Sequence, residues 1–295
     1  MDLKRRDYAF RTRKVLLAIF AIVSVALWTG ISVACIIIDS TGVAGFFSGG
    51  TDDQVFPLLT TGNYSVAVGG AAFRGNFYGQ PVNSNVWIAE NGNINFSVDG
   101  DGSFFPQSFS DSPASSRIAP FWDDFQFFAG ETNQIIDHSR IGDYLAVTWR
   151  DAFLFNDLVF GVPLDYDKRI TTQVVWFERD MNVNGFDFKK DDIAFGYSGY
   201  RNGNIDATIG VSHGSAPGMF TSIPGDSDGL ISSRLGQSNL IPWNDNEFLL
   251  FRPTANGMSY TGTREFITAV PESSSIFLAF AWMAFAFAKW RRQLF

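Results

Sequence analysis

Short apolar runs separated by turn residues fill most of the chain between positions 63 and 252. Residues 86–96 have the sequence VWIAENGNINF, and residues 117–125 have the sequence RIAPFWDDF. Runs of this length, bounded by Gly, Asn, Asp and Ser, are typical of β-strands that share one core. Asn91-Gly92 predicts a hairpin between two runs, because both residue types tolerate a positive φ. Pro120 has no N–H to give a central strand, so its run is predicted to lie at a strand end or sheet edge.

The same pattern continues along this region, where no window of about 12 residues has a helical period. We therefore predict a mostly β fold, namely an antiparallel two-layer β-sandwich-like domain flanked by N- and C-terminal apolar membrane helices. The remaining predicted strands are residues 64–68, 73–78, 124–128, 134–138, 144–149, 170–178, 193–197, 207–212 and 247–252.

An apolar segment, residues 15–38, precedes this region and contains no charged residue. It exceeds the core of about 7 to 15 residues in an ordinary signal peptide and is long enough for a membrane helix. Ser32-Val33-Ala34 supplies small residues suited to signal peptidase. A cleaved signal and an uncleaved anchor both remain open. Cys35 is either a lipidated residue after cleavage or an inert Cys in an apolar helix.

Charge is distributed unevenly along the chain. The two ends hold 9 of the 22 basic residues and 3 of the 30 acidic ones, which leaves 13 basic and 27 acidic residues between them. Basic flanks stay in the cytoplasm, so the acidic middle is predicted to be exported. A phosphate-binding surface needs concentrated Lys and Arg, which argues against nucleic acid as a partner. The single Cys excludes an intramolecular disulfide.

Four segments of the middle region, taken together, resemble a known module. They are Phe77-Tyr78-Gly79, VWIAENGNINF, RIAPFWDDF and, at residues 144–149, YLAVTW. Their order is similar to that of the nidogen-like extracellular module, the NIDO domain. Residues 185–199, GFDFKKDDIAFGYSG, and residues 207–214, ATIGVSHG, resemble its later strands. The resemblance implies a β-rich module at residues 63–214 that serves cell–matrix adhesion.

The C-terminal tail, residues 266–295, resembles the PEP-CTERM sorting signal. A short apolar helix, residues 276–288, is bounded by a Pro-containing motif and by positive charge, which holds such a segment in the membrane. The resemblance implies cleavage near Pro271-Glu272 by an exosortase, and a permanent anchor is the alternative. Ser273 stands where that family usually has Pro. The motif is Val270, Pro271, Glu272, Ser273 and Ser274, and the basic stop is Lys289, Arg291 and Arg292.

These patterns divide the chain into six predicted parts. They are a basic cytoplasmic segment at 1–14, a signal peptide or anchor helix at 15–38, a linker at 39–62, the NIDO-like β domain at 63–214, a β-containing extension at 215–265 and the sorting tail at 266–295.

Residues 180–191 match the oxygen spacing of an EF-hand-like calcium loop. Asp180, Asn182 and Asn184 alternate, Gly185 permits a sharp turn, and Asp191 ends the loop. A calcium loop would have an apolar residue at the eighth position and Glu at the twelfth, and its flanks would be helices rather than predicted strands. An acidic hairpin connection without metal is the alternative interpretation, and no other cofactor is predicted.

Catalytic motifs have little support in the sequence. His138 and His213 lie outside nucleophile and metal motifs. Asp123 and Asp124 are neighbours on a predicted strand, so their side chains diverge. We therefore predict that the protein is not an enzyme. Most tryptophans are predicted to lie in the core, and a sugar-stacking platform is the alternative for some of Trp87, Trp122, Trp149, Trp176 and Trp243.

The combined pattern predicts an exported protein of the bacterial cell envelope. Its expected role is structural or adhesive, at the cell surface or in the exopolysaccharide matrix of a biofilm. The expected partners are the export machinery, signal peptidase, an exosortase, the membrane, and a matrix protein or polysaccharide. A carbohydrate-binding or carbohydrate-active domain is the alternative.

Overall fold

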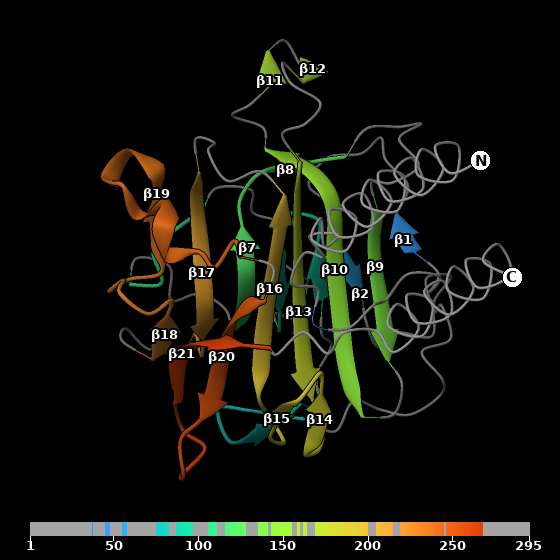
Figure 1. Ribbon diagram of the computed structural model, residues 1–295, viewed down its shortest axis with the longest axis vertical. Helices are drawn as coiled ribbons and strands as arrows, with labels where there is room; N and C mark the ends of the chain where they lie inside the picture. Colours follow the sequence, from blue (N-terminus) through green and yellow to red (C-terminus); the bar gives the residue numbers. More distant parts are fainter. Residues whose placement is uncertain are drawn as a thin grey trace, which may run out of the picture. The chain divides into compact units, whose positions relative to one another are not determined.

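Two antiparallel β-sheets make up the folded part of the chain (Figure 1). The computed structural model describes residues 37, 45–47, 55–57, 75–82, 87–96, 106–110, 116–127, 135–140, 143–154, 158–159, 162–163, 169–199, 205–214, 219–244 and 246–267. Within these ranges there is no α-helix, and no helix long and apolar enough to cross a membrane. The fold is mostly β, antiparallel and sandwich-like, which confirms this part of the predicted class, whereas the predicted terminal helices lie outside the described residues apart from Ile37.

The larger sheet contains eight strands, and the smaller sheet contains seven. The larger sheet has the order β1 (Gly45–Phe47), β9 (Ile135–Arg140), β10 (Tyr144–Leu154), β13 (Ile170–Phe177), β16 (Ile193–Gly199), β20 (Glu247–Pro253) and β21 (Tyr260–Phe266), with β8 (Phe125–Gln126) paired to β10. The smaller sheet has the order β18 (Phe220–Ser222), β17 (Asp206–Ser212), β7 (Arg117–Trp122), β6 (Asn93–Asn95), β5 (Trp87–Ala89) and β2 (Val55–Pro57), with β19 (Leu230–Ser232) paired to β17.

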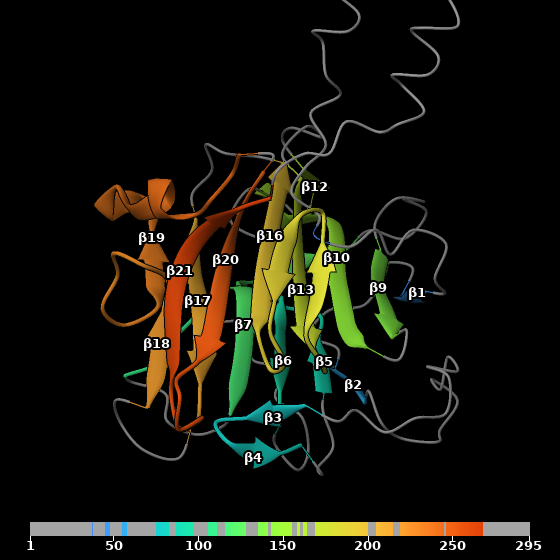
Figure 2. The same cartoon turned by 60° about the horizontal axis from the view of Figure 1, so that its bottom comes forward.

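Three short hairpins and two 3-10 turns complete the described elements. Figure 2 shows the hairpin of β3 and β4 lying across one end of the two sheets. The hairpins are β3 (Asn76–Phe77) with β4 (Gln80–Pro81), β11 (Leu158–Val159) with β12 (Val162–Pro163), and β14 (Met181–Val183) with β15 (Phe186–Phe188). The 3-10 turns are η2 (Ser233–Leu235) and η3 (Gln237–Leu240).

The main core lies between the two sheets and follows the period of two along each strand. On β10, Leu145, Val147 and Trp149 belong to this core. Tyr144 and Ala146 belong instead to a cluster on the outer face of the larger sheet. Successive side chains of a strand point to opposite faces, so the alternating register places one set in each cluster. Each fully buried large apolar side chain contributes about 1.5–3 kcal/mol.

Hydrogen bonds from buried aromatic side chains link elements of the two sheets that are far apart in the sequence. Trp149 Nε1 on β10 donates to the Ala89 carbonyl on β5 at 2.8 Å. Tyr197 on β16 donates its hydroxyl to the Pro120 carbonyl on β7 at 2.7 Å. These two bonds link the larger sheet to the smaller one, so segments that carry the NIDO resemblance meet in the core.

The outer cluster covers the far face of the larger sheet. It contains Ile37, Tyr144, Ala146, Val175, Phe177, Phe188, Ala194, Phe248, Leu250 and Ile267. The β14–β15 hairpin supplies part of this cover, because Phe188 stacks on Phe177 with ring centroids 4.1 Å apart. Ile37 is the described residue of the predicted segment at 15–38, and it is buried in this cluster. The chain divides into compact units between Ala34 and Cys35, so Ile37 belongs to the sandwich.

The prediction that Pro120 lies at a strand end or sheet edge is wrong. Pro120 lies inside β7, which pairs with β6 on one side and β17 on the other. A bulge explains why the strand tolerates it: Trp122 pairs with Thr208 and Ala119 with Gly210, so two residues of β7 oppose Ile209. The ladder is interrupted there, and the missing N–H is not required.

The predicted hairpin at Asn91-Gly92 is confirmed, with a three-residue loop between β5 and β6. Gly92 alone of the two has a positive φ, at 71°. The predicted extension is continuous with the predicted NIDO-like region, because β18, β19 and β20 pair with strands of that region and β21 pairs with β20. These residues therefore complete the same sandwich. The predicted strand at 64–68 lies outside the described residues.

Candidate functional site

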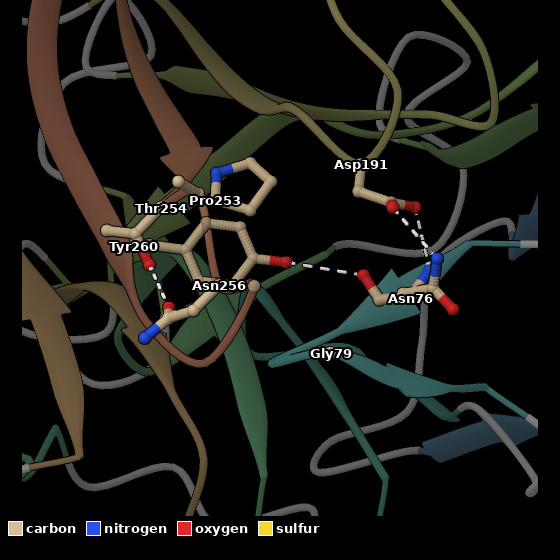
Figure 3. A pocket seen from close by; sticks show the side chains of 9 residues that line it. Asn76, Gly79, Asp191, Pro253, Thr254, Asn256 and Tyr260 are labelled. Atoms are coloured by element: carbon tan, nitrogen blue, oxygen red, sulfur yellow. Dashed lines mark hydrogen bonds between the residues drawn. The ribbon is translucent and has the colours of Figure 1, made fainter.

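A polar pocket lies where three turns meet at one end of the sandwich (Figure 3). The turns are Tyr78-Gly79 between β3 and β4, residues 189–192 between β15 and β16, and the loop between β20 and β21. The pocket has a volume of about 380 Å³, within the range of roughly 300–1,000 Å³ for small-molecule sites. Its lining consists of Asn76, Gly79, Asp191, Pro253, Thr254, Ala255, Asn256, Gly257 and Tyr260.

The Asp191 carboxylate is clamped by one residue, Asn76. The backbone N–H of Asn76 donates to Oδ1 at 2.7 Å, and its side-chain Nδ2 donates to Oδ2 at 2.9 Å. Asp191 adopts a positive φ of 67°, which Asp tolerates better than most residues. A carboxylate offers about four lone-pair sites. The clamp uses two of them and fixes the direction of the others.

The β3–β4 hairpin forms one wall through an unusual turn. Tyr78 and Gly79 have φ values of 50° and 73°, and a positive φ at a bulky residue costs about 1–3 kcal/mol. Tyr78 is buried and donates its hydroxyl to the Val211 carbonyl at 3.0 Å, which offsets this cost. Burial raises the pKa of the Tyr78 hydroxyl well above its usual value, so it stays a neutral donor.

The β20–β21 loop forms the opposite wall, and its conformation is fixed by its own polar side chains. Asn256 Oδ1 accepts from Thr254 Oγ1 at 2.8 Å and from the Met258 backbone N–H at 3.0 Å. Thr254 also contacts the Ser259 hydroxyl at 2.9 Å. Glycine is favoured where this loop meets the first wall, because both Gly79 and Gly257 have a positive φ.

Tyr260 lies between the two walls, and its hydroxyl points toward Asn76, as Figure 3 shows. Its hydroxyl donates to the Asn76 carbonyl at 3.3 Å, and its side chain is buried. Burial raises the pKa of the Tyr260 hydroxyl far above its usual value, and the charge of Asp191 raises it further. Tyr260 is thus a neutral hydroxyl that holds Asn76, which in turn holds Asp191.

An ion pair next to the pocket secures the turn that carries Asp191. Arg252 Nε donates to Asp192 Oδ1 at 2.9 Å, and the Asp192 carboxylate is fully buried. Asp192 Oδ2 also accepts from the Lys189 backbone N–H at 2.8 Å. Asp192 raises the pKa of Arg252 above its usual value through this hydrogen bond. The two adjacent carboxylates therefore have different surroundings. The charge of Asp192 is compensated by the Arg252 guanidinium, whereas Asp191 is held by the backbone N–H and side-chain amide of Asn76.

The structure places the predicted calcium residues on the β14–β15 hairpin and the turn that follows it. Asn182 Nδ2 donates to Asp187 Oδ1 at 2.7 Å. Asp180 accepts from the Lys190 backbone N–H at 2.8 Å and from Lys189 Nζ at 3.1 Å. Asn184 occupies the hairpin turn with φ 51°. Asp191 bonds with Asn76 instead, so the side chains of Asp180, Asn182 and Asp191 have separate protein partners. Calcium binding itself stays a prediction.

The other residues singled out from the sequence are mostly structural. Trp122, Trp149, Trp176 and Trp243 are all buried, which confirms the core prediction for these four. Asp123 is also buried, and its Oδ1 accepts from the Asp124 backbone N–H at 2.8 Å. His213 meets the Tyr78 ring edge-on, with centroids 5.2 Å apart. The sorting motif, the basic stop and Cys35 lie outside the described residues.

Sequence reasoning missed most of the pocket. Asp191 was selected as the end of a calcium loop, whereas its partner Asn76 lies 115 positions away. No local pattern reveals a pair at that separation. Asn256-Gly257 did carry a usable signal, because this dipeptide favours a tight turn between strands. It would have predicted β20 and β21 as a hairpin.

No protein-family model, curated protein or solved structure matches the chain.

Proposed function

We propose that this chain is an exported protein of the bacterial cell envelope with a structural or adhesive role, sorted through its C-terminal tail. The proposal combines the basic and apolar segments at both ends with the β-sandwich between them. Basic residues flank each apolar segment on the side that stays in the cytoplasm. The acidic middle region is then presented on the outside, where a β-sandwich serves as a stable surface module.

One observation carries this proposal. Ile37, inside the N-terminal apolar segment, and Ile267, the described residue nearest to the C-terminal one, are both buried in the outer cluster of the larger sheet. Ile267 is further fixed by its backbone N–H, which donates to the Asn246 carbonyl at 2.9 Å. Both ends of the sandwich therefore start from the same sheet face. This arrangement suits a precursor whose two ends enter one membrane.

The short spacing at the C-terminal end supports the same geometry. Eight residues, 268–275, separate Ile267 from the apolar helix predicted at 276–288. A fully extended segment of that length reaches roughly 30 Å. The predicted cleavage at Pro271-Glu272 would then take place close to the membrane surface, where a membrane-bound exosortase works.

The experiment is to recover the mature protein from its host envelope and determine its intact mass and both terminal sequences. Loss of the segment after about Val270 is expected. Glu272→Gln should retain the tail, whereas the matched control Glu265→Gln, on β21, should be processed like the parent chain. Recovery of a parent chain that begins at Met1 and ends at Phe295 would contradict the sorting proposal.

Carbohydrate binding is the second candidate function, and the polar pocket is the observation that favours it. Its walls hold a carboxylate, amides and a hydroxyl from three separate turns. Such groups recognise hydroxyl-bearing ligands through directional hydrogen bonds. The buried tryptophans do not supply a stacking platform, so the pocket is the stronger basis for this function.

A further inference from the structure

We infer that the pocket between Asn76, Asp191 and Thr254 is a binding site for a neutral sugar unit of a polysaccharide. This inference rests on the second function proposed above and specifies its site and ligand class. It is independent of how the chain is exported or sorted, because it concerns the folded sandwich alone.

The charge of the pocket favours a neutral ligand over an anionic one. Among the described lining residues, Asp191 alone carries a charge. The adjacent Arg252 is engaged by Asp192, and Lys189 is engaged by Asp180. An acidic sugar or a phosphate would therefore meet a carboxylate without a compensating cation, and like charges repel at short distance.

The hydrogen-bonding groups favour a ligand that carries several hydroxyls. Asp191 keeps acceptor capacity beyond the two bonds from Asn76. Thr254 Oγ1 donates its proton to Asn256 Oδ1, which leaves this oxygen as an acceptor toward a ligand hydroxyl. These groups come from different turns, so a ligand that satisfies them must present polar atoms in more than one direction. A sugar ring does so, whereas a small apolar molecule does not.

The rigidity of the pocket is the feature that suits recognition. Asn76 is held by Asp191 and by Tyr260, and the β20–β21 loop is held by Asn256. Asp191 and Tyr78 both adopt positive φ values at its rim. Conformations of this kind persist where the surrounding structure fixes them, and they concentrate at ligand sites. Preorganised polar groups lose less conformational entropy when a ligand binds.

A metal ion fits the same geometry less well. Calcium takes about 6–8 oxygen ligands, usually with several carboxylates. The described lining offers one carboxylate, and no group of three or more His, Cys, Asp or Glu that would hold a metal occurs among the described residues. Binding of calcium or of an amine in place of a neutral sugar would contradict the inference.

The test is a titration of the purified full-length protein in detergent with neutral hexoses and N-acetylhexosamines, monitored by ligand-observed NMR and calorimetry. Hexuronates, calcium chloride and methylammonium chloride are titrated in parallel. At least one neutral sugar is expected to bind. Asp191→Asn should weaken that binding at least tenfold, because Asn also tolerates a positive φ but lacks the carboxylate charge.

Asp187→Asn is the matched control, since it makes the same change on the exposed side of the hairpin and should leave binding unchanged. Thr254→Val provides a second variant if Asp191→Asn fails to fold, and it should weaken binding by a similar factor. Binding of calcium, an amine or a hexuronate without any neutral sugar would overturn the inference. So would sugar binding that both pocket variants retain in full.

The outcomes separate this inference from the export proposal. If no neutral sugar binds the purified protein, the inference about the pocket is overturned. That result has no bearing on the export proposal, which is tested by the terminal sequences of the protein recovered from the envelope. Retention of Met1 and Phe295 overturns sorting and leaves the titration unaffected.

Discussion

Trp149 on β10 donates its indole N–H to the carbonyl of Ala89 on β5, and this bond of 2.8 Å joins the larger sheet to the smaller one. Both residues are completely buried. A carbonyl at this depth has no water to replace the indole, so the bond is costly to remove. The hairpin that carries Ala89 also carries Gly92, so the inter-sheet bond and the close approach of Gly92 to Phe121 lie in one region.

Replacing Trp149 with Phe should therefore destabilise the fold in two ways. It removes the indole N–H donor, and it leaves a smaller ring in the core. We expect a decrease in the free energy of unfolding of about 2–4 kcal/mol, from an unsatisfied buried carbonyl and a small cavity. Trp243→Phe is the comparison, because its indole bonds to Ser238 within one loop at 3.2 Å. Denaturant unfolding of the two variants tests the difference, and equal losses would contradict a special role for the inter-sheet bond.

Gly92 should not tolerate any side chain. Its φ is positive, and a Cβ there would overlap the Phe121 carbonyl oxygen and press on the Phe125 ring. We expect Gly92→Ala to cost more than about 3 kcal/mol, because backbone strain and a steric clash add. Gly185→Ala is a matched control: it also has a positive φ, at 83°, but nothing lies within 4 Å of the added Cβ.

The control should lose only about 1 kcal/mol, the typical strain for Ala in this region. Thermal and denaturant unfolding of both variants gives the measurement. A similar loss for the two glycines would mean that conformation, rather than the close approach of Phe121, sets the requirement at Gly92.

The sequence was sufficient for strands that contain continuous apolar runs and insufficient for those that do not. β10, β13 and β16 have nearly uniform burial, so their apolar residues stand out. β21 is an edge strand of mixed exposure with the sequence YTGTREF, and its pattern gives no such contrast. Edge strands need only one partner and one covered face, which leaves most of their positions free to be polar.

The candidate site could not be predicted because its groups meet only in the folded chain. Asn76, Asp191 and Thr254 come from three separate turns, and each looks like an ordinary loop residue in the sequence. The prediction for Pro120 was wrong for a related reason. The sequence rule excludes Pro from a central strand because Pro has no N–H, but the bulge opposite Ile209 interrupts the ladder, so no N–H is required at Pro120.

The Arg252–Asp192 pair should be worth more than an exposed ion pair. Removing the guanidinium leaves the buried Asp192 carboxylate without its partner. We therefore expect Arg252→Ala to lower the free energy of unfolding by about 2–3 kcal/mol. This is less than the usual cost of breaking a fully buried pair, because Arg252 is partly solvated. The side chain of Arg252 is 39% exposed, whereas that of Asp192 is fully buried.

Arg179→Ala is the matched control, because it breaks the surface pair of Arg179 with Asp143, in which the Arg side chain is 66% exposed. Exposed pairs contribute about 0–1 kcal/mol. Urea unfolding of the two variants at low salt tests the comparison. Arg252→Lys should recover part of the stability, and a loss no larger than that of Arg179→Ala would show that burial of Asp192 adds nothing to the strength of the pair.

Asp180 should make the stability of the β14–β15 region depend on acid pH. The backbone N–H of Lys190, followed by the Lys189 ammonium, lowers the pKa of Asp180 below its usual value. A carboxyl whose pKa is lower in the folded state than in the unfolded state stabilises the fold above its unfolded pKa of about 3.9. That contribution is lost as the pH falls through the folded pKa.

The measurement is the unfolding midpoint of the parent protein and of Asp180→Asn between pH 7 and pH 2. The parent should be the more stable above about pH 4, and the difference should shrink toward pH 2, where both side chains are neutral. Lys189→Met should reduce the difference without removing it, because the Lys190 backbone N–H remains. A gap that stays constant across the whole pH range would mean that Asp180 acts through its shape rather than its charge.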